Sequence, residues 1–460
     1  MTVRHRYTYN TPSHFLVAAA TCALLFTGAC RAAITLEFAV TENTYDSKLE
    51  KIDGKDQTVP HNTTEQFTET VVLDDRRFSL SKGDDTTVYD FTNNQIIFFN
   101  NKDHTYYQRS LFSVVAFNLM EFKNRQFLSD VLSKSGVDNN PMGRLPTEHL
   151  FSIHYKKNPL TLAPTQSGDW IRYGHKDMPL IRFQRGEKIQ ASKAKAYVQF
   201  LRYRLGGHPL ILDALLEQQT IPRRLEFSRY NMNRQVLDYQ LSSMQKNSGL
   251  FPDTADFREI AGDDADEIET LIFNNRKLAS QADRHFNELI ANAEKHYQDK
   301  NYLSSMLSYL EFTLTKGADL PASFHDRKTN LTANQQVRQL MKHINPSNKE
   351  EAELAVKTLT SLREFSGDTK HVMDIFIGNI RANLGEDEQA HELLFEAIKK
   401  NGMIAGVYKD LGDSYFNAYQ TRLAWLCWDF ARQIANDHKM LQHINAYENE
   451  LVENFPEFFL

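Results

Sequence analysis

The sequence predicts a protein of two parts, an N-terminal α+β domain built on an antiparallel sheet and a C-terminal all-helical repeat domain. Short β-branched and aromatic runs, separated by turn residues, fill much of the first half. In the second half, glycine, alanine and large apolar residues recur at a spacing of 34 positions. A segment rich in Gly, Pro and Asp lies between the two halves. At 460 residues the chain is too long for one ordinary core, which also favours two or three domains.

The chain begins with the features of an export signal. Basic residues come first, and the apolar stretch over residues 15–26 has the length of a signal-peptide core, which is too short to span a membrane. Small residues follow, and we expect cleavage after Ala32, so that residues 1–32 are a signal peptide and the mature protein is exported, either periplasmic or secreted. Residues 27–30 also resemble a bacterial lipoprotein box, with threonine where leucine is usual, so lipidation of Cys30 is an alternative. A retained N-terminal anchor would be a third outcome, and no later segment is predicted to be a transmembrane helix.

Cysteine usage gives no sign of disulfide or zinc chemistry in the mature chain. Cys22 and Cys30 fall in or beside the signal, which leaves Cys427 alone. One cysteine cannot form an intramolecular disulfide, nor build a zinc site by itself. Because Cys427 lies between Trp425 and Trp428, we expect it to be a buried small apolar residue.

The first part of the mature chain has the pattern of an antiparallel meander. From about residue 34, β-branched and aromatic runs alternate with turns of Asp, Asn, Gly and Lys. The clearest predicted strands are residues 68–73, 76–81, 86–91, 95–100 and 104–109. A helix is expected next, over residues 111–134.

A second mixed stretch follows this helix. Its predicted strands are residues 151–156, 169–173, 179–185, 221–227 and 236–242, and its predicted helices are residues 191–203 and 208–218. Together with the meander, these elements predict one α+β domain over residues 33–246.

The order of these elements resembles that of the periplasmic lipoprotein-carrier half-barrels over about residues 34–246. The stretches that carry the resemblance are residues 87–91 through 105–107, and the strand that begins at Ile221-Pro222 with its closing hairpin. The resemblance implies a strongly curved antiparallel sheet whose concave face takes up a lipid or acyl chain. Composition alone is also consistent with a sheet whose concave face is simply packed by helices.

Residues 247–267 are predicted to be a linker. Gly and Pro come first, and residues 262–267 are strongly acidic. They lack the order of oxygen ligands, central glycine and final glutamate that a calcium loop needs. We therefore expect a linker that leads into an acidic helix N-terminus, where the helix dipole stabilises carboxylates.

The rest of the chain, residues 268–460, reads as helix throughout. A first hairpin is expected over residues 268–317. Further helices are expected over residues 333–344, 348–365, 368–384, 386–400, 403–418, 421–434 and 438–454, the last as a cap. Residues 455–460 resemble an apolar docking tail, although folding back onto the last repeat is the favoured interpretation.

Two copies of the helical repeat stand next to each other. Three pairs of small residues are each 34 positions apart: Gly378 and Gly412, Ala390 and Ala424, Ala397 and Ala431. Small residues are expected where two helices cross closely, and large ones where neighbouring hairpins meet. The predicted packing residues are Ile377, Gly378, Ala390, Leu394, Ala397, Tyr408, Leu411, Gly412, Tyr415, Ala424, Trp428 and Ala431. The pattern resembles the tetratricopeptide-repeat (TPR-like) superfamily, which implies a solenoid that binds a protein or peptide.

The sequence carries no recognisable catalytic signature, and no catalytic, cofactor-binding or metal-binding residue is predicted from it. His149 and His154 are five positions apart, as are His438 and His443, a spacing that does not place two imidazoles on one helix face. Surface or hydrogen-bonded histidines are expected instead.

Charge argues against nucleic acid as a partner. Residues 261–460 hold 21 Lys and Arg against 31 Asp and Glu, a net charge of −10, and the total of −6 leaves +4 for residues 1–260. A nucleic-acid surface needs a concentrated basic face, which an acidic helical half does not supply.

These observations predict a non-enzymatic envelope protein that acts as a protein- or peptide-binding scaffold through its TPR-like domain. The alternative is a carrier or sensor of a lipophilic ligand or lipoprotein through the half-barrel-like domain. A hydrolase with an unrecognised site is a third interpretation. No cofactor is predicted.

Overall fold

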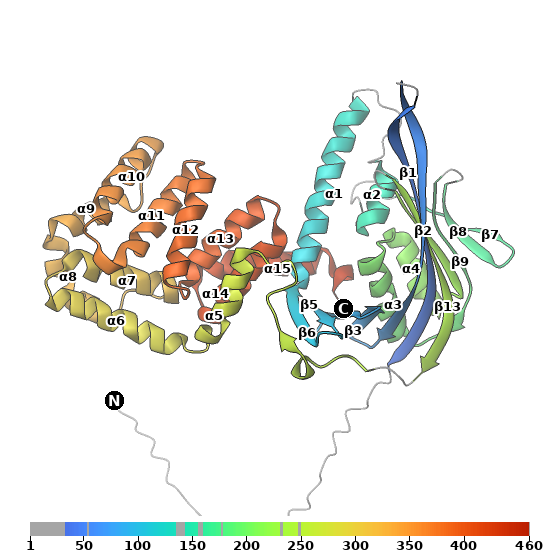
Figure 1. Cartoon of the computed structure of the whole chain (residues 1–460), viewed down its shortest axis with the longest axis horizontal. Helices are drawn as coiled ribbons and strands as arrows, with labels where there is room; N and C mark the ends of the chain where they lie inside the picture. The colour runs from blue at the N-terminus through green and yellow to red at the C-terminus, as the bar shows by residue number, and fades with distance from the viewer. Residues whose placement is uncertain are drawn as a thin grey trace, which may run out of the picture.

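The computed structural model describes residues 33–459 apart from 53–54, 135–142, 155–159, 176–177, 231–232 and 247–249. The predicted signal peptide, with Ala32 and Cys30, lies outside the described residues. An N-terminal sheet domain and a C-terminal helical region stand side by side (Figure 1).

Twelve strands of the described chain form one sheet, in the order β14-β6-β5-β4-β3-β2-β1-β13-β12-β9-β8-β7. Their bounds are β1 Ile34–Ile52, β2 Lys55–Leu73, β3 Arg77–Lys82, β4 Asp85–Asp90, β5 Gln95–Asn100, β6 Thr105–Ser110, β7 Thr165–Ser167, β8 Trp170–His175, β9 Met178–Gln184, β12 Arg224–Tyr230, β13 Arg234–Lys246 and β14 Arg258–Glu259. A separate pair joins β10 (Glu187–Lys188) to β11 (Thr220–Ile221). Neighbours are antiparallel except β14, which runs parallel to β6, so the sheet is mixed.

The predicted meander is present as β2 to β6, but the sheet differs from the expected strongly curved one. It is open and is not strongly curled, and its two edge strands, β14 and β7, do not pair with each other. The hairpin of β1 and β2 is also longer than predicted, with paired residues from Ile34↔Leu73 to Ile52↔Lys55. Its outer half is polar, so it lacked the apolar alternation that identifies a strand.

Helices cover one face of the sheet. The described part of this domain contains four of them: α1 (Leu111–Lys134), α2 (Arg144–Phe151), α3 (Ala191–Arg204) and α4 (Pro209–Gln218). In Figure 1, α2, α3 and α4 lie between the sheet and α1, which stands next to the helical region. Phe200 of α3 stacks on Phe38 of β1 and meets Tyr239 of β13 edge-on, and all three side chains are buried.

The strand predicted for residues 151–156 is wrong over residues 151–154, because the chain around Phe151 belongs to the end of α2; residues 155–156 lie outside the described residues. Ser152 ends that helix in the left-handed conformation, with φ 56°. The buried apolar residues Phe151 and Ile153 are separated by the polar Ser152. This alternation of apolar and polar residues is typical of a strand, which is why a strand was predicted.

Helices make up residues 267–454 apart from their connections. They are α5 Glu267–Ala279, α6 Ala282–Gln298, α7 Tyr302–Lys316, α8 Ala322–Ala333, α9 Gln335–His343, α10 Lys349–Arg363, α11 Lys370–Asn383, α12 Asp387–Lys400, α13 Ala405–Asn417, α14 Thr421–Ile434 and α15 Gln442–Asn454. Helix α8 was not predicted, and the first predicted hairpin contains three helices, α5 to α7. The array is compatible with a helical repeat.

Local signals explain where several of these helices begin. Asp266 and Glu269 form a capping box at α5. Asn side chains accept backbone N–H bonds at the starts of α7, α9 and α10, namely Asn301, Asn334 and Asn348. Gly317, with φ 69°, ends α7 in the left-handed conformation that glycine adopts without strain.

The two halves share one apolar core. Val115 and Leu119 of α1 belong to the same buried cluster as Trp425 of α14 and Leu451 of α15. The expected linker also contributes to the sheet domain, because it contains β14 and because Phe257 packs edge-on against Phe99 of β5. The halves are therefore joined by packing as well as by the chain.

Residues 455–459 lie between the sheet domain and the last helices and pack against both. The Tyr203 hydroxyl of α3 donates to the Phe458 carbonyl at 2.7 Å, and the Gln199 side chain donates to the Glu457 carbonyl at 2.8 Å. Phe458 is 1% exposed, and Phe459 meets Phe112 of α1. Residues 455–459 thus pack against the cluster of the last helices, as the favoured interpretation expects, and also against α3, which it did not predict; Leu460 lies outside the described residues.

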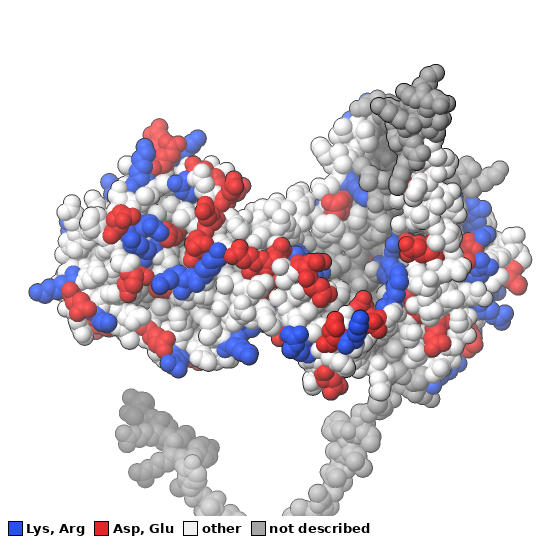
Figure 2. Space-filling view, viewed as in Figure 1, with Lys and Arg blue, Asp and Glu red and all other residues white. Residues whose placement is uncertain are grey.

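The surface carries acidic and basic side chains intermixed on the face shown in Figure 2. No helix among the described residues is both long enough and apolar enough to span a bilayer.

Candidate functional site

The predicted repeat residues lie where two helices of a hairpin approach each other. Gly412 of α13 faces α14, and a Cβ added to it would meet the Trp428 ring at 2.4 Å and the Ala424 carbonyl oxygen at 3.1 Å. Gly378 of α11 faces α12 in the same way, but its nearest neighbours, Leu394 and the Ala390 carbonyl, are at 3.2 and 3.3 Å. Both glycines thus allow a close helix crossing.

The other predicted packing residues are in the core, with one exception. Ile377, Ala390, Leu394, Ala397, Tyr408, Leu411, Ala424, Trp428 and Ala431 are all buried. Tyr415 is only partly buried, and its hydroxyl lies 3.0 Å from Nε2 of His391 on α12. It therefore faces a groove outside the hairpin core.

This groove, between α1 and the helical region, is the candidate functional site. It encloses about 810 Å³. Helix α1 forms one wall, and the N-terminus of α5, the exposed side of α12 and the α13–α14 connection form the other. A groove between two packed units is a common place for a ligand.

Aromatic rings line much of the groove. His391 stacks on Phe395, with ring centroids 5.8 Å apart, and meets Tyr415 edge-on at 5.3 Å. Phe117 of α1 and Tyr419 after α13 also line it, and they are 43% and 50% exposed. Burial lowers the pKa of His391 below its ordinary value, so its ring is neutral at neutral pH and suits an apolar ligand.

Charged residues at the ends of the groove are mostly paired with each other. Arg422 contacts both Asp266 and Glu269, and Lys399 contacts Glu267 at 2.9 Å. Glu392 is exposed beside the groove. The two cations are therefore balanced by carboxylates of the protein itself and do not need a charged ligand.

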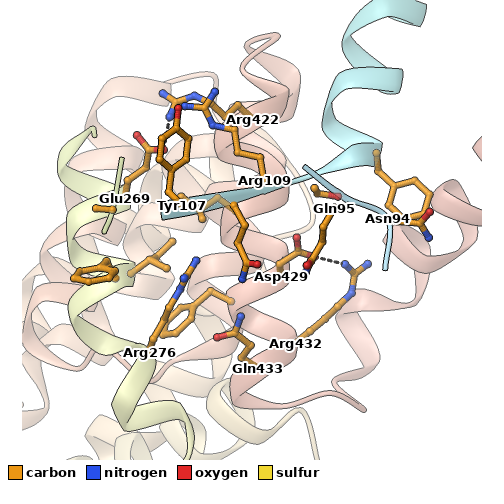
Figure 3. Close-up of a pocket in the computed structure, with 18 of the residues that line it drawn as sticks. Asn94, Gln95, Tyr107, Arg109, Glu269, Arg276, Arg422, Asp429, Arg432 and Gln433 are labelled. Carbon is orange, nitrogen blue, oxygen red and sulfur yellow. Dashed lines mark hydrogen bonds and ion pairs between the residues drawn. The ribbon is translucent and has the colours of Figure 1, made fainter. Parts of the chain in front are cut away.

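A smaller polar cavity of about 350 Å³ adjoins the groove at Arg109 and Arg422, which line both. Figure 3 shows these two arginines at one end, near Tyr107, while Arg276, Asp429 and Arg432 lie deeper. Arg432 donates to Asp429 at 2.7 Å and to Glu448 at 2.8 Å. Burial, opposed in part by Arg432, raises the pKa of Asp429 to about 6.

Arg109 differs from the other arginines of this cavity. Among the described residues, no carboxylate lies within ion-pair distance of its guanidinium, and its buried Nε donates no hydrogen bond. Its charge is instead placed over the rings of Phe98 and Tyr107, at 5.2 and 5.0 Å. Arg109 can therefore receive an acidic group from a ligand in the groove.

The groove offers aromatic faces, one guanidinium and hydrogen-bonding groups, among them the Tyr415 hydroxyl next to His391. These groups can bind an apolar ligand that carries an acidic group. Cys427, the one cysteine among the described residues, is fully buried as predicted, and burial raises the pKa of its thiol, so it is unsuited to act as a nucleophile.

The groove was not predictable from the sequence, because its walls come from four separate elements, α1, α5, α12 and α13. The exposed Phe117, in a helix that is apolar on most sides, was the available signal. The spacing of histidines along the chain also does not show which of them meet in the fold. His149 is a buried, hydrogen-bonded histidine, 3.0 Å from the Ser228 carbonyl, whereas His154 approaches Glu148 and His208.

The sequence has no detectable similarity to a known family or to a curated protein.

Proposed function

We propose that this chain is an exported, non-enzymatic envelope protein that binds an extended segment of a partner protein in the groove between α1 and the helical region. The observation that carries the proposal is the combination of exposed aromatic rings with Arg109, which has no carboxylate partner among the described residues. Aromatic and arginine side chains are the groups that most often dominate protein interfaces. The resemblance to TPR-like repeats supports the same class of function.

The chemistry of the groove indicates the kind of segment it would take. Phe117, Phe395 and Tyr419 offer apolar contact area for one or two large side chains. Arg109 at the inner end would form a charge-assisted hydrogen bond with a carboxylate of the segment. We therefore expect an apolar segment with an acidic residue or a free C-terminus.

A lipophilic ligand on the covered face of the sheet has less support. The rings of Phe38, Phe200 and Tyr239 occupy the space between β1, β13 and α3, and all are buried. This arrangement agrees with the alternative stated from composition, a sheet whose face is packed by helices. We therefore favour the groove as the binding site.

A displayed random-peptide library, selected on the full mature protein, tests the proposal. We expect enriched peptides to combine aromatic or aliphatic residues with a carboxylate. Their affinity should fall at least about tenfold in Arg109→Gln, the loss typical of one charged hydrogen bond, and in Phe117→Ala. Arg284→Gln, which changes an arginine that is 77% exposed on α6, is the matched control and should bind as the wild type does. Peptides that bind all four proteins equally would contradict the proposal.

A further inference from the structure

We propose that Glu148, His154 and His208 form a binding site for one divalent transition-metal ion, zinc in the first place, inside the N-terminal domain. Each residue offers one ligand atom, and the three atoms lie within 4.8 Å of one another. Two imidazole nitrogens and one carboxylate oxygen are a donor set that zinc takes in proteins, with water as the fourth ligand. The proposal is independent of the groove, because none of the three residues lines it.

The fold brings the three ligands together from two separate elements. Glu148 lies in the last turn of α2, His154 follows the end of that helix, and His208 caps the start of α4. His149 holds the two elements in place, since its Nδ1 accepts the backbone N–H of His208 at 2.9 Å and its carbonyl accepts that of Gly207 at 2.7 Å. The backbone of the site is therefore fixed without any metal.

The distances are close to those of a metal site. Oε2 of Glu148 is 2.7 Å from Nε2 of His208 and 4.0 Å from Nδ1 of His154. Ligand atoms about 2.0–2.1 Å from a tetrahedral zinc ion are about 3.3 Å from each other. Each of these two separations would change by less than about 1 Å. The third, between the two imidazole nitrogens, is at most 4.8 Å and would shorten by up to about 1.5 Å, and side-chain rotations can supply these shifts.

His154 gives an independent indication of a missing partner. Its Nδ1 is buried and has no hydrogen-bond partner, although the atom points towards the Glu148 carboxylate. Buried ring nitrogens are nearly always hydrogen-bonded or bound to a metal. The His154 side chain is 33% exposed and lines a cavity of about 480 Å³ between α1 and α15, which gives an ion a route to the ligands.

Two neighbouring contacts affect metal binding: one orients a ligand, and the other would be lost when the ion binds. Arg144 contacts the other carboxylate oxygen of Glu148, Oε1, at 3.0 Å, so it orients the carboxylate and leaves Oε2 towards the histidines. Metal binding through Nε2 of His208 places the ring proton on Nδ1, which now accepts the Leu210 N–H. That bond is long, at 3.3 Å, so its loss costs little, but the His208 ring must also turn so that the new Nδ1–H does not face the Leu210 N–H.

Metal analysis of the full mature protein tests the site. The protein carries no histidine tag, is incubated with Zn²⁺, and is dialysed against metal-free buffer before its zinc content is measured by mass spectrometry. We expect about one zinc ion per chain. Co²⁺ in place of Zn²⁺ should give the visible absorption of a low-coordinate nitrogen- and oxygen-ligated ion.

Two variants remove one ligand each with little damage to the fold. His154→Gln changes a partly exposed side chain, and His208→Asn keeps an acceptor that can cap α4. Both should lower zinc affinity at least about tenfold, whereas His325→Gln, at an exposed histidine of α8, should not. Absence of bound zinc in the wild type, or zinc that remains in both ligand variants, would overturn the proposal and leave a hydrogen-bonded Glu–His cluster.

Discussion

At the scale of single residues, Gly412 and Gly378 show how closely the paired helices approach. Both lie in helix interiors, where glycine is about 1 kcal/mol less favourable than alanine. The contacts that a Cβ would make explain why each position is occupied by glycine despite this cost. The two positions differ in how much room they leave, so the same substitution should have different effects.

Gly412→Ala should lower the free energy of unfolding by about 2 kcal/mol, because its Cβ would meet the rigid Trp428 ring at 2.4 Å. Gly378→Ala should cost less than about 1 kcal/mol, because Leu394 can move by a few tenths of an ångström and alanine favours the helix. Urea unfolding of both variants measures the difference. An equal effect, or a larger loss at Gly378, would contradict the proposed close crossing of α13 and α14.

Asp429 should make stability depend on pH. Its folded pKa of about 6 lies above its ordinary value of 3.8, so its contribution to stability is full below pH 3.8 and is lost as the pH rises through 6. Its side chain keeps 41% of its accessible surface in the cavity, so water screens part of this effect and we expect about 1 kcal/mol. The loss between pH 4 and pH 7 should be absent in Asp429→Asn, measured by urea unfolding at each pH. Parallel pH profiles for the two proteins would show that Asp429 does not carry the effect.

At the scale of elements, the C-terminal tail (residues 455–459) contacts both halves of the protein and connects them by packing. It leaves α15, which packs on α1, and places Phe458 under α3. Residues 455–459 form part of the core between the sheet domain and the helical region.

Phe458→Ala should therefore destabilise the protein by about 3–5 kcal/mol, the usual cost of removing a buried phenylalanine side chain. Phe365→Ala, at a phenylalanine that is 62% exposed after α10, should change stability by less than about 0.5 kcal/mol. Thermal unfolding of both variants compares them. A small effect at Phe458 would mean that the tail is not part of the core.

Elements with long periodic patterns and clear ends were predictable from sequence. The bounds of α1 were predicted to the residue, and α11 to α14 within a few residues, since Gly385 and Gly402 mark breaks between them. Helices α2 and α8 were not predicted, because α2 is short and the α8 segment is mostly polar and follows Pro321. The expected strong curvature of the sheet rested only on the resemblance, because no local sequence pattern specifies how far a sheet curls.

At the scale of the whole molecule, the groove exists because α1 packs against the helical region through a shared apolar core. Sequence patterns predicted the two-part layout and the pairing of small residues within hairpins. They could not predict which hairpin meets α1, since Phe117 and Tyr419 are far apart in the chain and share no periodic pattern. The Glu148, His154 and His208 cluster was missed for the same reason.

Photo-crosslinking in the native envelope tests the central claim, that a partner segment lies in the groove, most directly. A photoreactive amino acid replaces Phe117 or Tyr419 in the full chain, and Phe365 outside the groove serves as control. We predict that both groove positions crosslink to one and the same segment of one protein, that Arg109→Gln reduces both crosslinks, and that the Phe365 position gives neither. Crosslinks to lipid alone, or the same products at all three positions, would contradict the account.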